Sequence, residues 1–541
     1  MRKEAHCLPP PLPPPPRRQQ CNMLRAAAHR PCALPACLVR LPLRRPLRQS
    51  LLDSQPRCFV HSDQGHRDCG TTISRNGRRN GLTPQQINGR VLGCDGADKL
   101  LTLYAESHQQ MNAVNVSTLW VQLQRSQISR PLLLHSDLVV ALLQHTQSLH
   151  HEFGPQALGN ILHALGKLAH RHRSFASSCK EASLALMTEA AVRRSELKPQ
   201  GLANVLYAFG LMAPHGVVTA EACGLLVTEA AARRSELKPQ GLANVLYAFG
   251  LLAPHGVVAA EACGLLVTEA AARRSELRPQ DLSNTLYAFG LMAPHGVVAA
   301  EACGVLVTEA AAQRSELNEQ SLANTLYACA LMDLRHQALE PASPLWQRIV
   351  AAGPILTAKA QCQLHQTLMW RRALQSEPAL PEPLRRSLHE VFASQPTTAS
   401  RTEQELCGVL SSPEAEGMGI HSVASDHRTA EGFSIDVHIE RSAGTPFLVE
   451  FDGPSHFLQT PMQGGTAAYA SIGHTLKLNS PTAFKHRVLR ALGHRLVSVG
   501  FREWGSLPRA QSARLQWLLD RMDAEEERHA SMSVSNPPSR R

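Results

Sequence analysis

A 40-residue segment recurs along the middle of the chain and limits the possible fold more than any other feature. Residues 201–240 and 241–280 differ at only three positions, a third copy begins at Asp281, and a diverged fourth copy begins at Ser321. A degenerate earlier copy starts at Ala157. A fixed period of this length is typical of stacked arrays, in which each unit buries its apolar face against its neighbours. The sequence therefore predicts a solenoid.

Each unit contains two predicted helices. Pro199 can occupy the first turn of the first helix, where its missing N–H costs nothing. Apolar residues then recur at helical spacing until Pro214 and Gly216 break the chain, and a second helix ends near Arg233 and Arg234. The predicted apolar stripes consist of Leu202, Val205, Leu206, Phe209 and Met212 in the first helix and of Val218, Ala222, Leu225 and Leu226 in the second.

Polar and basic residues also recur at fixed positions of the repeat. Arginine pairs at the end of the second helix could contact a phosphate backbone, or they could simply complement the helix dipole. Asparagines and tyrosines of the first helix could bond to and stack on unpaired bases, or they could bond and pack between adjacent repeats. The candidate RNA-binding residues are Arg193, Arg194, Arg233, Arg234, Arg273, Arg274, Asn204, Asn244, Asn284 and Asn324, and the tyrosines are Tyr207, Tyr247, Tyr287 and Tyr327.

The repeat sequence L-x-P-Q-x-L-A-N-x-L-Y-A-F/L-G, followed by a second helix, resembles the octatricopeptide (OPR) repeats of algal organelle RNA-maturation and translation factors. The resemblance covers roughly residues 115–335 and implies that the solenoid binds single-stranded RNA. The tryptophan-bearing end of the OPR consensus is missing here, which leaves the base-reading positions open. HEAT and armadillo arrays share the same helical pattern and often bind proteins, so a protein-interaction scaffold is an alternative.

The pattern changes from helices to strands towards the C terminus. After a predicted linker with a short helix, residues 433–440 and 446–453 form two β-rich runs joined by a short loop. A helix is predicted over 481–492 and a third strand over 494–501. This β-β-α-β order predicts a small α/β domain separate from the solenoid, and an α+β chain as a whole.

The segments LVEFDGPSHF, TLKLNS and AFKHRVLRALGHRLVSVGFREW, within about 433–507, resemble the RAP domain. The resemblance implies an RNA-binding module of organelle RNA processing, stability, ribosomal RNA maturation or translation. It also implies a fold similar to that of PD-(D/E)xK endonucleases. The RNA-binding candidates here are His456, Phe457, Lys477, Lys485, His486, Arg487, Arg490 and Trp504, although Trp504 could equally belong to the core.

The endonuclease similarity raises the alternative of a metal-dependent endoribonuclease. Glu450 and Asp452 point to one side of a strand, and Asp436 on the preceding strand could join them to hold Mg²⁺ and activate water. Asp436 matches the aspartate of the motif and Glu450 its acidic residue, but the position of the motif lysine holds Asp452. Lys477 or Lys485 could substitute for it, and His456 could act as a base. If instead the strand simply ends at Asp452 and backbone donors satisfy the acids, we expect no cofactor.

Most of the net charge of +11 lies in the first 60 residues. They hold eleven Lys/Arg and two acids, which leaves about +2 for the rest, so any RNA-binding face must be a local patch. From Met23 the chain is rich in Arg, Ala and Leu, without an acid until Asp53. This composition is typical of a chloroplast or mitochondrial transit peptide, although a disordered basic tail would look similar.

Other features limit the compartment and the partners. No stretch of eighteen uncharged apolar residues occurs, so we expect no membrane-spanning helix. The 14 cysteines include no CxxC and are expected to be reduced, buried thiols, whereas the linker residues Cys58, His61, His66 and Cys69 fit no common zinc spacing. Expected partners are single-stranded organellar RNA and other RNA-processing proteins. The predicted parts are a leader (1–60), a linker (61–112), the solenoid (113–395), a linker with a short helix (396–430), the RAP-like domain (431–510) and a helix with a disordered tail (511–541).

Overall fold

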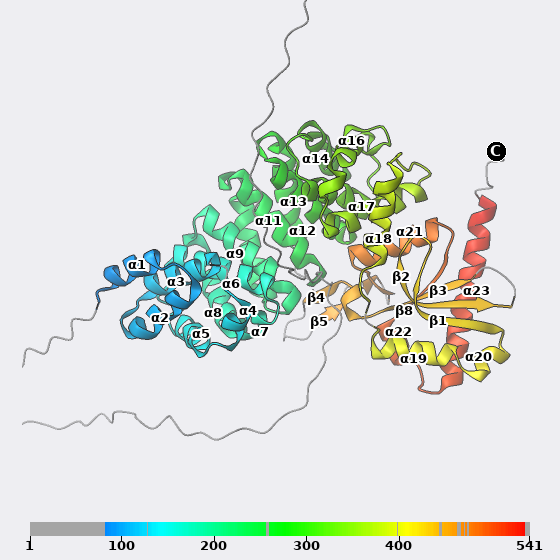
Figure 1. Ribbon diagram of the computed structural model, residues 1–541, viewed down its shortest axis with the longest axis horizontal. Coiled ribbons are helices and arrows are strands. Elements are labelled where there is room, and N and C mark those ends of the chain that lie inside the picture. Colours follow the sequence, from blue (N-terminus) through cyan, green and yellow to red (C-terminus); the bar gives the residue numbers. More distant parts are fainter. Residues whose placement is uncertain are drawn as a thin grey trace, which may run out of the picture. The chain divides into compact units, whose positions relative to one another are not determined.

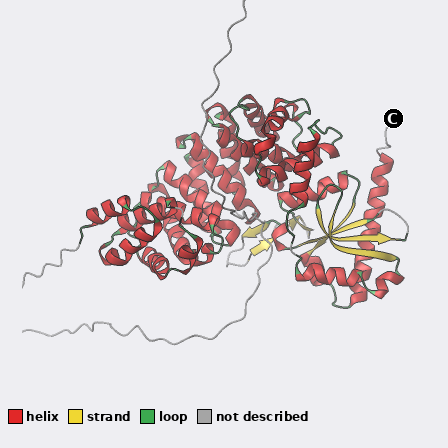
Figure 2. Cartoon of the chain, viewed as in Figure 1, coloured by secondary structure: helices red, strands yellow, loops and turns green. Residues whose placement is uncertain are grey.

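A computed structural model describes residues 82–126, 128–255, 259–397, 399–442, 446–461, 467–469, 471–472 and 475–535. All of them belong to one compact unit. In the described part of the chain, residues 84–393 form helices and their connections, and strands occur only in the C-terminal region (Figure 2). The predicted leader and the Cys58–Cys69 segment lie outside the described residues. Within the described part, no helix combines the length and the apolar character that crossing a membrane requires.

Two helices precede the repeats, where a linker was predicted. They are α1 (Pro84–Gly93) and α2 (Ala97–Ser107), so the prediction of a linker over 61–112 is wrong for its described part. Thr83 caps α1 through the backbone N–H of Gln86, whose side chain in turn accepts from Thr83. Ile87 and Val91 are buried on one side of this helix. The two helices therefore extend the solenoid at its N-terminal end.

The solenoid continues with the helices α3 (Ala113–Arg125), α4 (Arg130–His135), α5 (Asp137–Ser148), α6 (Pro155–Arg171), α7 (Phe175–Ser178), α8 (Lys180–Val192), α9 (Pro199–Met212), α10 (Ala220–Ala232), α11 (Pro239–Leu252), α12 (Ala260–Ala272), α13 (Pro279–Met292), α14 (Ala300–Ala312), α15 (Glu319–Met332), α16 (Pro344–Ala352), α17 (Ala358–Ala373) and α18 (Glu382–Ala393). The first helices of successive units (α6, α9, α11, α13, α15 and α17) pack side by side, and the second helices α8, α10, α12 and α14 form another layer (Figure 1). The predicted solenoid is confirmed.

The first helices α6, α9, α11 and α13 closely approach the next first helix because each has a glycine at the contact. A Cβ atom added at Gly250 would lie 2.7 Å from the Cα of Ala288 in the next unit, and one at Gly210 would lie 2.8 Å from the Cα of Ala248. Real Cβ atoms do not approach backbone this closely. The glycine of the A-F-G motif therefore sets the spacing between units.

The second helices bury a slightly different stripe from the predicted one. Ala222 and Leu226 are buried as expected, but Leu225 is 39% exposed, and Cys223 and Val227 are buried instead. The thiols of Cys223, Cys263 and Cys303 are buried in the core, as predicted. Burial raises the pKa of Cys263 to about 12, so this group stays a neutral thiol.

The C-terminal domain contains a four-stranded sheet with the order β1-β2-β3-β8. β2 (Ser434–Arg441) is antiparallel to both of its neighbours, β1 (Ile420–Arg428) and β3 (Phe447–Asp452), and β8 (Arg495–Gly500) is parallel to β3. The three predicted strands are confirmed. β1 corrects the prediction of a linker up to residue 430: its polar sequence lacks a buried stripe, and its hydrogen bonds to β2 define it instead.

Helices cover both faces of this sheet. Phe484, Val488 and Leu489 of α21 (Ser480–Ala491) pack with Leu448 and Leu496, in a core that is continuous with that of the solenoid. The other face, with Val449 and Val497, packs against α19 (Arg401–Leu410) and α23 (Gln511–Ser535). Glu525 and the following residues, predicted to be a disordered tail, continue α23 to Ser535. The remaining elements are α20 (Pro413–Gly417), α22 (Phe501–Ser506), β4 (Gln459–Pro461), β5 (Ala467–Tyr469), β6 (Ser471–Ile472) and β7 (Thr475–Leu476).

Candidate RNA-binding surface and carboxylate cluster

The first arginine of each pair is engaged within the solenoid. Arg233 pairs with Glu236 at 2.9 Å and donates from Nη1 to the carbonyl oxygen of Leu197, in the preceding unit, at 2.8 Å. Arg193 and Arg273 make the equivalent contacts. These three guanidinium groups therefore join neighbouring units, and their charge is already balanced by glutamate. This geometry favours a structural role for them over phosphate binding.

The second arginine of each pair is less constrained. Arg194 and Arg234 each donate to a carbonyl oxygen at the end of their own helix, at 3.1 Å. Arg274 makes the same contact at 3.4 Å and is exposed. Arg234 also lies 3.8 Å from Glu269 of the next unit. Of the predicted arginine ladder, this second set is the part that a phosphate backbone could reach.

The repeated tyrosines stack on one another across the units. Ring centroids are 6.1 Å apart between Tyr207 and Tyr247, 6.4 Å between Tyr247 and Tyr287, and 6.5 Å between Tyr287 and Tyr327. The tyrosines therefore pack between adjacent repeats, which was the alternative to stacking on RNA bases. Asn204, Asn244 and Asn284 are half-buried, and Asn324 is buried, where it accepts hydrogen bonds from Gln320 and Gln363.

Helix α21 of the C-terminal domain continues the row of tyrosine ring contacts. The ring of Phe484 meets that of Tyr327 edge-on at 5.7 Å. Ser480 donates from Oγ to the carbonyl oxygen of Gly290 at 2.6 Å, and Arg487 donates from Nη2 to that of Ala330 at 2.6 Å. Helix α21 thus lies across the C-terminal ends of α13 and α15. The C-terminal domain is in direct contact with the solenoid through this helix.

Glu450 and Asp452, two of the three predicted carboxylates, contact side chains of α21, and the third, Asp436, contacts the backbone of β3. The Nζ of Lys485 lies 2.7 Å from Oε1 of Glu450, which is 3% exposed, and also donates to the carbonyl oxygen of Ser434 at 2.6 Å. Asp436 accepts from the backbone N–H of Phe451 at 2.7 Å. Of the two lysines considered as substitutes for the motif lysine, the structure places Lys485 beside the acid.

Asp452 has a separate set of partners. Its Oδ1 lies 2.9 Å from Nδ1 of His456 and 3.6 Å from Nε2 of His486, and its Oδ2 accepts from the hydroxyl of Ser498. Burial would raise the pKa of Asp452, but the hydrogen bond from His456, the charge of His486 and the bond from Ser498 lower it overall. Burial alone would lower the pKa of His456, and the bond to Asp452 raises it instead. Asp452 is therefore an ionised, fully partnered carboxylate.

The three acids do not converge on one point. In the described part of the chain, ligand atoms of three His, Cys, Asp or Glu residues come within 4.8 Å of one another only at His150, His151 and Glu189. There, Glu189 is also paired with Arg193 at 3.6 Å. The cluster of Asp436, Glu450 and Asp452 is thus a buried polar network in this conformation, in which each acid has its own partner.

The pKa of Asp436 is unusually high, so the stability of the folded protein is expected to depend on pH. Burial and the nearby charge of Glu450 raise the pKa of Asp436 to about 7. Because the folded pKa exceeds the unfolded one, this group favours folding at low pH, and its contribution is lost between about pH 4 and pH 7, by up to about 1.4 kcal/mol per pH unit. We expect Asp436→Asn to raise the unfolding temperature at pH 8 and to leave it nearly unchanged at pH 4. The amide oxygen can still accept from Phe451.

Calorimetric unfolding of both proteins from pH 4 to pH 8 checks this expectation. Glu405→Gln, at an exposed carboxylate next to Arg514 on the other side of the sheet, is the matched control and should give no such pH-dependent gain. Equal unfolding temperatures for Asp436→Asn and the unsubstituted protein at pH 8 would show that Asp436 is not protonated near neutrality.

The other predicted binding residues of this domain have different surroundings. Trp504 is 2% exposed, with the guanidinium of Arg514 4.6 Å from its ring centre, so the prediction that it stacks on RNA is wrong. Phe457 is buried against Phe501. A sequence with Arg-Glu-Trp beside a strand suits either a surface or a core tryptophan, and only the packing of α23 decides between them.

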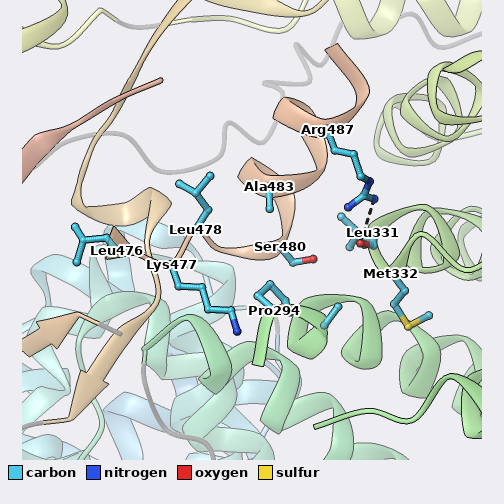
Figure 3. A pocket seen from close by; sticks show the side chains of 10 residues that line it. Pro294, Leu331, Met332, Leu476, Lys477, Leu478, Ser480, Ala483 and Arg487 are labelled. Atoms are coloured by element: carbon cyan, nitrogen blue, oxygen red, sulfur yellow. Dashed lines mark hydrogen bonds between the residues drawn. The ribbon is translucent and has the colours of Figure 1, made fainter. Parts of the chain in front are cut away.

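Lys477 and Arg487 line a groove between α21 and the solenoid, and Arg490 lines a neighbouring hollow along α21. The groove, of about 490 Å³, lies between Ala293, Pro294 and Met332 of the solenoid and Leu478 and Ala483 of the C-terminal domain (Figure 3). The hollow, of about 470 Å³, shares Leu478, Ala483 and Arg487 and continues past His486 to Arg490. The groove residues on the solenoid side were not predictable from the sequence, because no local pattern marks which repeat α21 contacts.

Comparison with known proteins supports the assignment of the C-terminal domain. Residues 449–519 match the RAP domain family. The matched segment begins within β3 and ends within α23, so it includes Glu450, the groove-lining helix α21 and β8. No curated protein matches the chain. The chain thus combines a helical-repeat solenoid with a C-terminal region that is similar to RAP domains.

Proposed function

We propose that this protein is an RNA-binding factor of chloroplast or mitochondrial post-transcriptional gene expression. The solenoid, resembling OPR repeats, contacts single-stranded RNA, and the RAP-like domain holds it, in RNA processing, RNA stability, ribosomal RNA maturation or translation. Other RNA-processing proteins are further expected partners, and the basic leader is proposed to direct import.

One observation carries the proposal: the RAP-like region presents a groove with the cations Lys477 and Arg487 and a neighbouring hollow with Arg490. Cationic side chains supply most of the affinity for a nucleic-acid backbone. Lys477 and Arg487 are at least half-buried rather than extended into solvent, so they are held in place for a ligand. A local positive groove in a chain whose charge is otherwise nearly balanced is what selective binding of a polyanion requires.

An RNA-binding measurement on the full chain tests the proposal. We expect labelled single-stranded RNA to be retarded and to stay intact in Mg²⁺ and in EDTA. The logarithm of the binding constant should fall with the logarithm of salt concentration by about 0.7 for each phosphate contacted. Double-stranded RNA of the same sequence is the control and should bind more weakly. No retardation at low salt would overturn the proposal and leave a protein-interaction scaffold.

A metal-dependent endoribonuclease is the second candidate, favoured by the position of Lys485. Its ammonium group supplies, from the helix side, the cation that the strand lacks at Asp452. RNA fragments that appear with Mg²⁺, but not with EDTA and not with a Glu450→Gln variant, would support this activity. Glu450→Gln keeps the shape of the side chain and its ability to accept from Lys485, so loss of cleavage would not simply reflect loss of the hydrogen bond.

A further inference from the structure

We infer that the groove between α21 and the solenoid is a subsite for one flipped-out nucleotide of the bound strand. The base lies between the apolar residues Pro294 and Met332 on one side and Leu478 and Ala483 on the other. The adjacent phosphate lies at Lys477 and Arg487. This inference rests on the proposed RNA-binding function and specifies where that function reads or grips a nucleotide.

The apolar walls of the groove suit the faces of a base. Ala293 and Pro294 follow α13, Leu331 and Met332 end α15, and Leu478 precedes α21. An unstacked base gains contact from apolar and sulfur-containing side chains on its two faces. A groove of about 490 Å³ is within the range of ~300–1,000 Å³ found for small-ligand sites.

The charged residues of the groove suit a phosphate. Figure 3 shows the Lys477 side chain extending towards the helices of the solenoid and Arg487 bonded to the end of α15. Among the described residues that line the groove, none is acidic. Asp333 lies outside this lining, 4.0 Å from Nε of Arg487. Arg490 is paired with Glu525 at 3.3 Å, so the charge available to a phosphate is mainly that of Lys477 and Arg487.

The guanidinium of Arg487 is fixed in place with donors to spare. Its Nη2 donates to the carbonyl oxygens of Ala330 and Leu331 at 2.6 and 3.4 Å, whereas its buried Nε has no hydrogen-bond acceptor. A buried donor without an acceptor is unfavourable and is rarely left so. The Nε atom itself is shielded from the groove, so a phosphate there would be bound through Nη1, on a side chain that is 36% exposed.

The neighbouring hollow has a neutral polar group. Burial lowers the pKa of His486 to about 4, and its Nε2 has no hydrogen-bond partner although Asp452 lies 3.6 Å away. His486 is thus a neutral, buried imidazole at pH 7, and it lines this hollow without offering Nε2 to a ligand. With Arg490 beyond it, the hollow lies in the direction that the next nucleotide would take.

Cross-linking of the full chain to random-sequence single-stranded RNA containing 4-thiouridine tests the subsite. We expect cross-linked peptides that contain Pro294, Met332 or Leu478. In the same binding assay, Lys477→Gln should lower the salt dependence by about one phosphate contact. Ala483→Trp fills the space for the base and should weaken binding about tenfold, the effect of losing one stacked base.

Two matched variants control for the loss of one positive charge and for the addition of a large ring, each at a position away from the groove. Lys180→Gln removes the same charge from exposed Lys180 on α8, and Ala105→Trp adds the same ring at exposed Ala105 in α2. Both should bind RNA as the unsubstituted protein does. If Ala483→Trp lowers the unfolding temperature, its weaker binding could reflect misfolding. The positions of the cross-links and the salt dependence of Lys477→Gln then test the subsite instead.

These measurements distinguish an incorrect subsite from a protein that does not bind RNA. RNA bound with cross-links only outside the groove, and with unchanged affinity and salt dependence of Lys477→Gln, would overturn the subsite and keep the proposed function. Absence of any retardation by the unsubstituted protein would overturn both.

Discussion

Lys485→Met is expected to destabilise the C-terminal domain by about 3 kcal/mol at pH 8, because it leaves a buried charge without its partner. Glu450 is 3% exposed, and the Nζ of Lys485 at 2.7 Å is its only cationic partner among the described contacts. Burial already raises the pKa of Glu450, and Lys485 opposes this shift. Without the lysine, Glu450 must either remain charged in an apolar site or take up a proton.

Hydrogen exchange of the β3 and β8 amides measures the effect separately from the solenoid, which need not unfold with this domain. A double variant, Lys485→Met with Glu450→Gln, removes both charges and should recover more than half of the loss. The single variant should also be less destabilised at pH 5, where Glu450 can be protonated. Unchanged exchange in the single variant at pH 8 would mean that the ion pair is not stabilising and that Lys485 is free for another role.

The fold was predictable where a local pattern encodes it. The period of 40 residues gives the paired helices directly, and the β-rich runs 446–453 and 494–501 give β3 and β8. β1 was missed because its residues are mostly exposed or half-buried and its hydrogen bonds to β2, rather than its composition, define it. Helices α1 and α2 were missed although Thr83-Pro84 and Gln86 form a recognisable capping signal.

The site was predictable only in part, for a similar reason. The alternation of a strand places Glu450 and Asp452 on one face, and the sequence shows this. The spacing of Arg193 and Glu196, three residues apart, could also have predicted that the first arginine of each pair is engaged. The groove depends instead on contacts of Ser480 with Gly290 and of Arg487 with Ala330. Contacts over such separations leave no periodic signal in one sequence.

Gly250→Ala is expected to destabilise the solenoid by about 2 kcal/mol, although alanine is the better helix former. The added Cβ would lie 2.7 Å from the Cα and 2.9 Å from the Cβ of Ala288, and these backbone-linked atoms cannot turn away. Overpacking of this kind costs about 1–3 kcal/mol, and the gain in helix propensity of about 1 kcal/mol offsets only part of it. Because each unit is stabilised by its neighbours, separation of α11 from α13 should also weaken the adjacent interfaces.

The same repeat provides the control for this change. Gly264 lies in α12, and a Cβ added there would meet nothing within 4 Å. Gly264→Ala should therefore raise the unfolding temperature, through a gain of about 0.5–1 kcal/mol, while Gly250→Ala lowers it. Thermal unfolding of the two variants beside the unsubstituted protein separates packing from propensity, since both are the same substitution within a helix. If both variants gained stability equally, the first helices would not be held at the close spacing seen here, and the glycine of the A-F-G motif would need another explanation, such as contact with RNA.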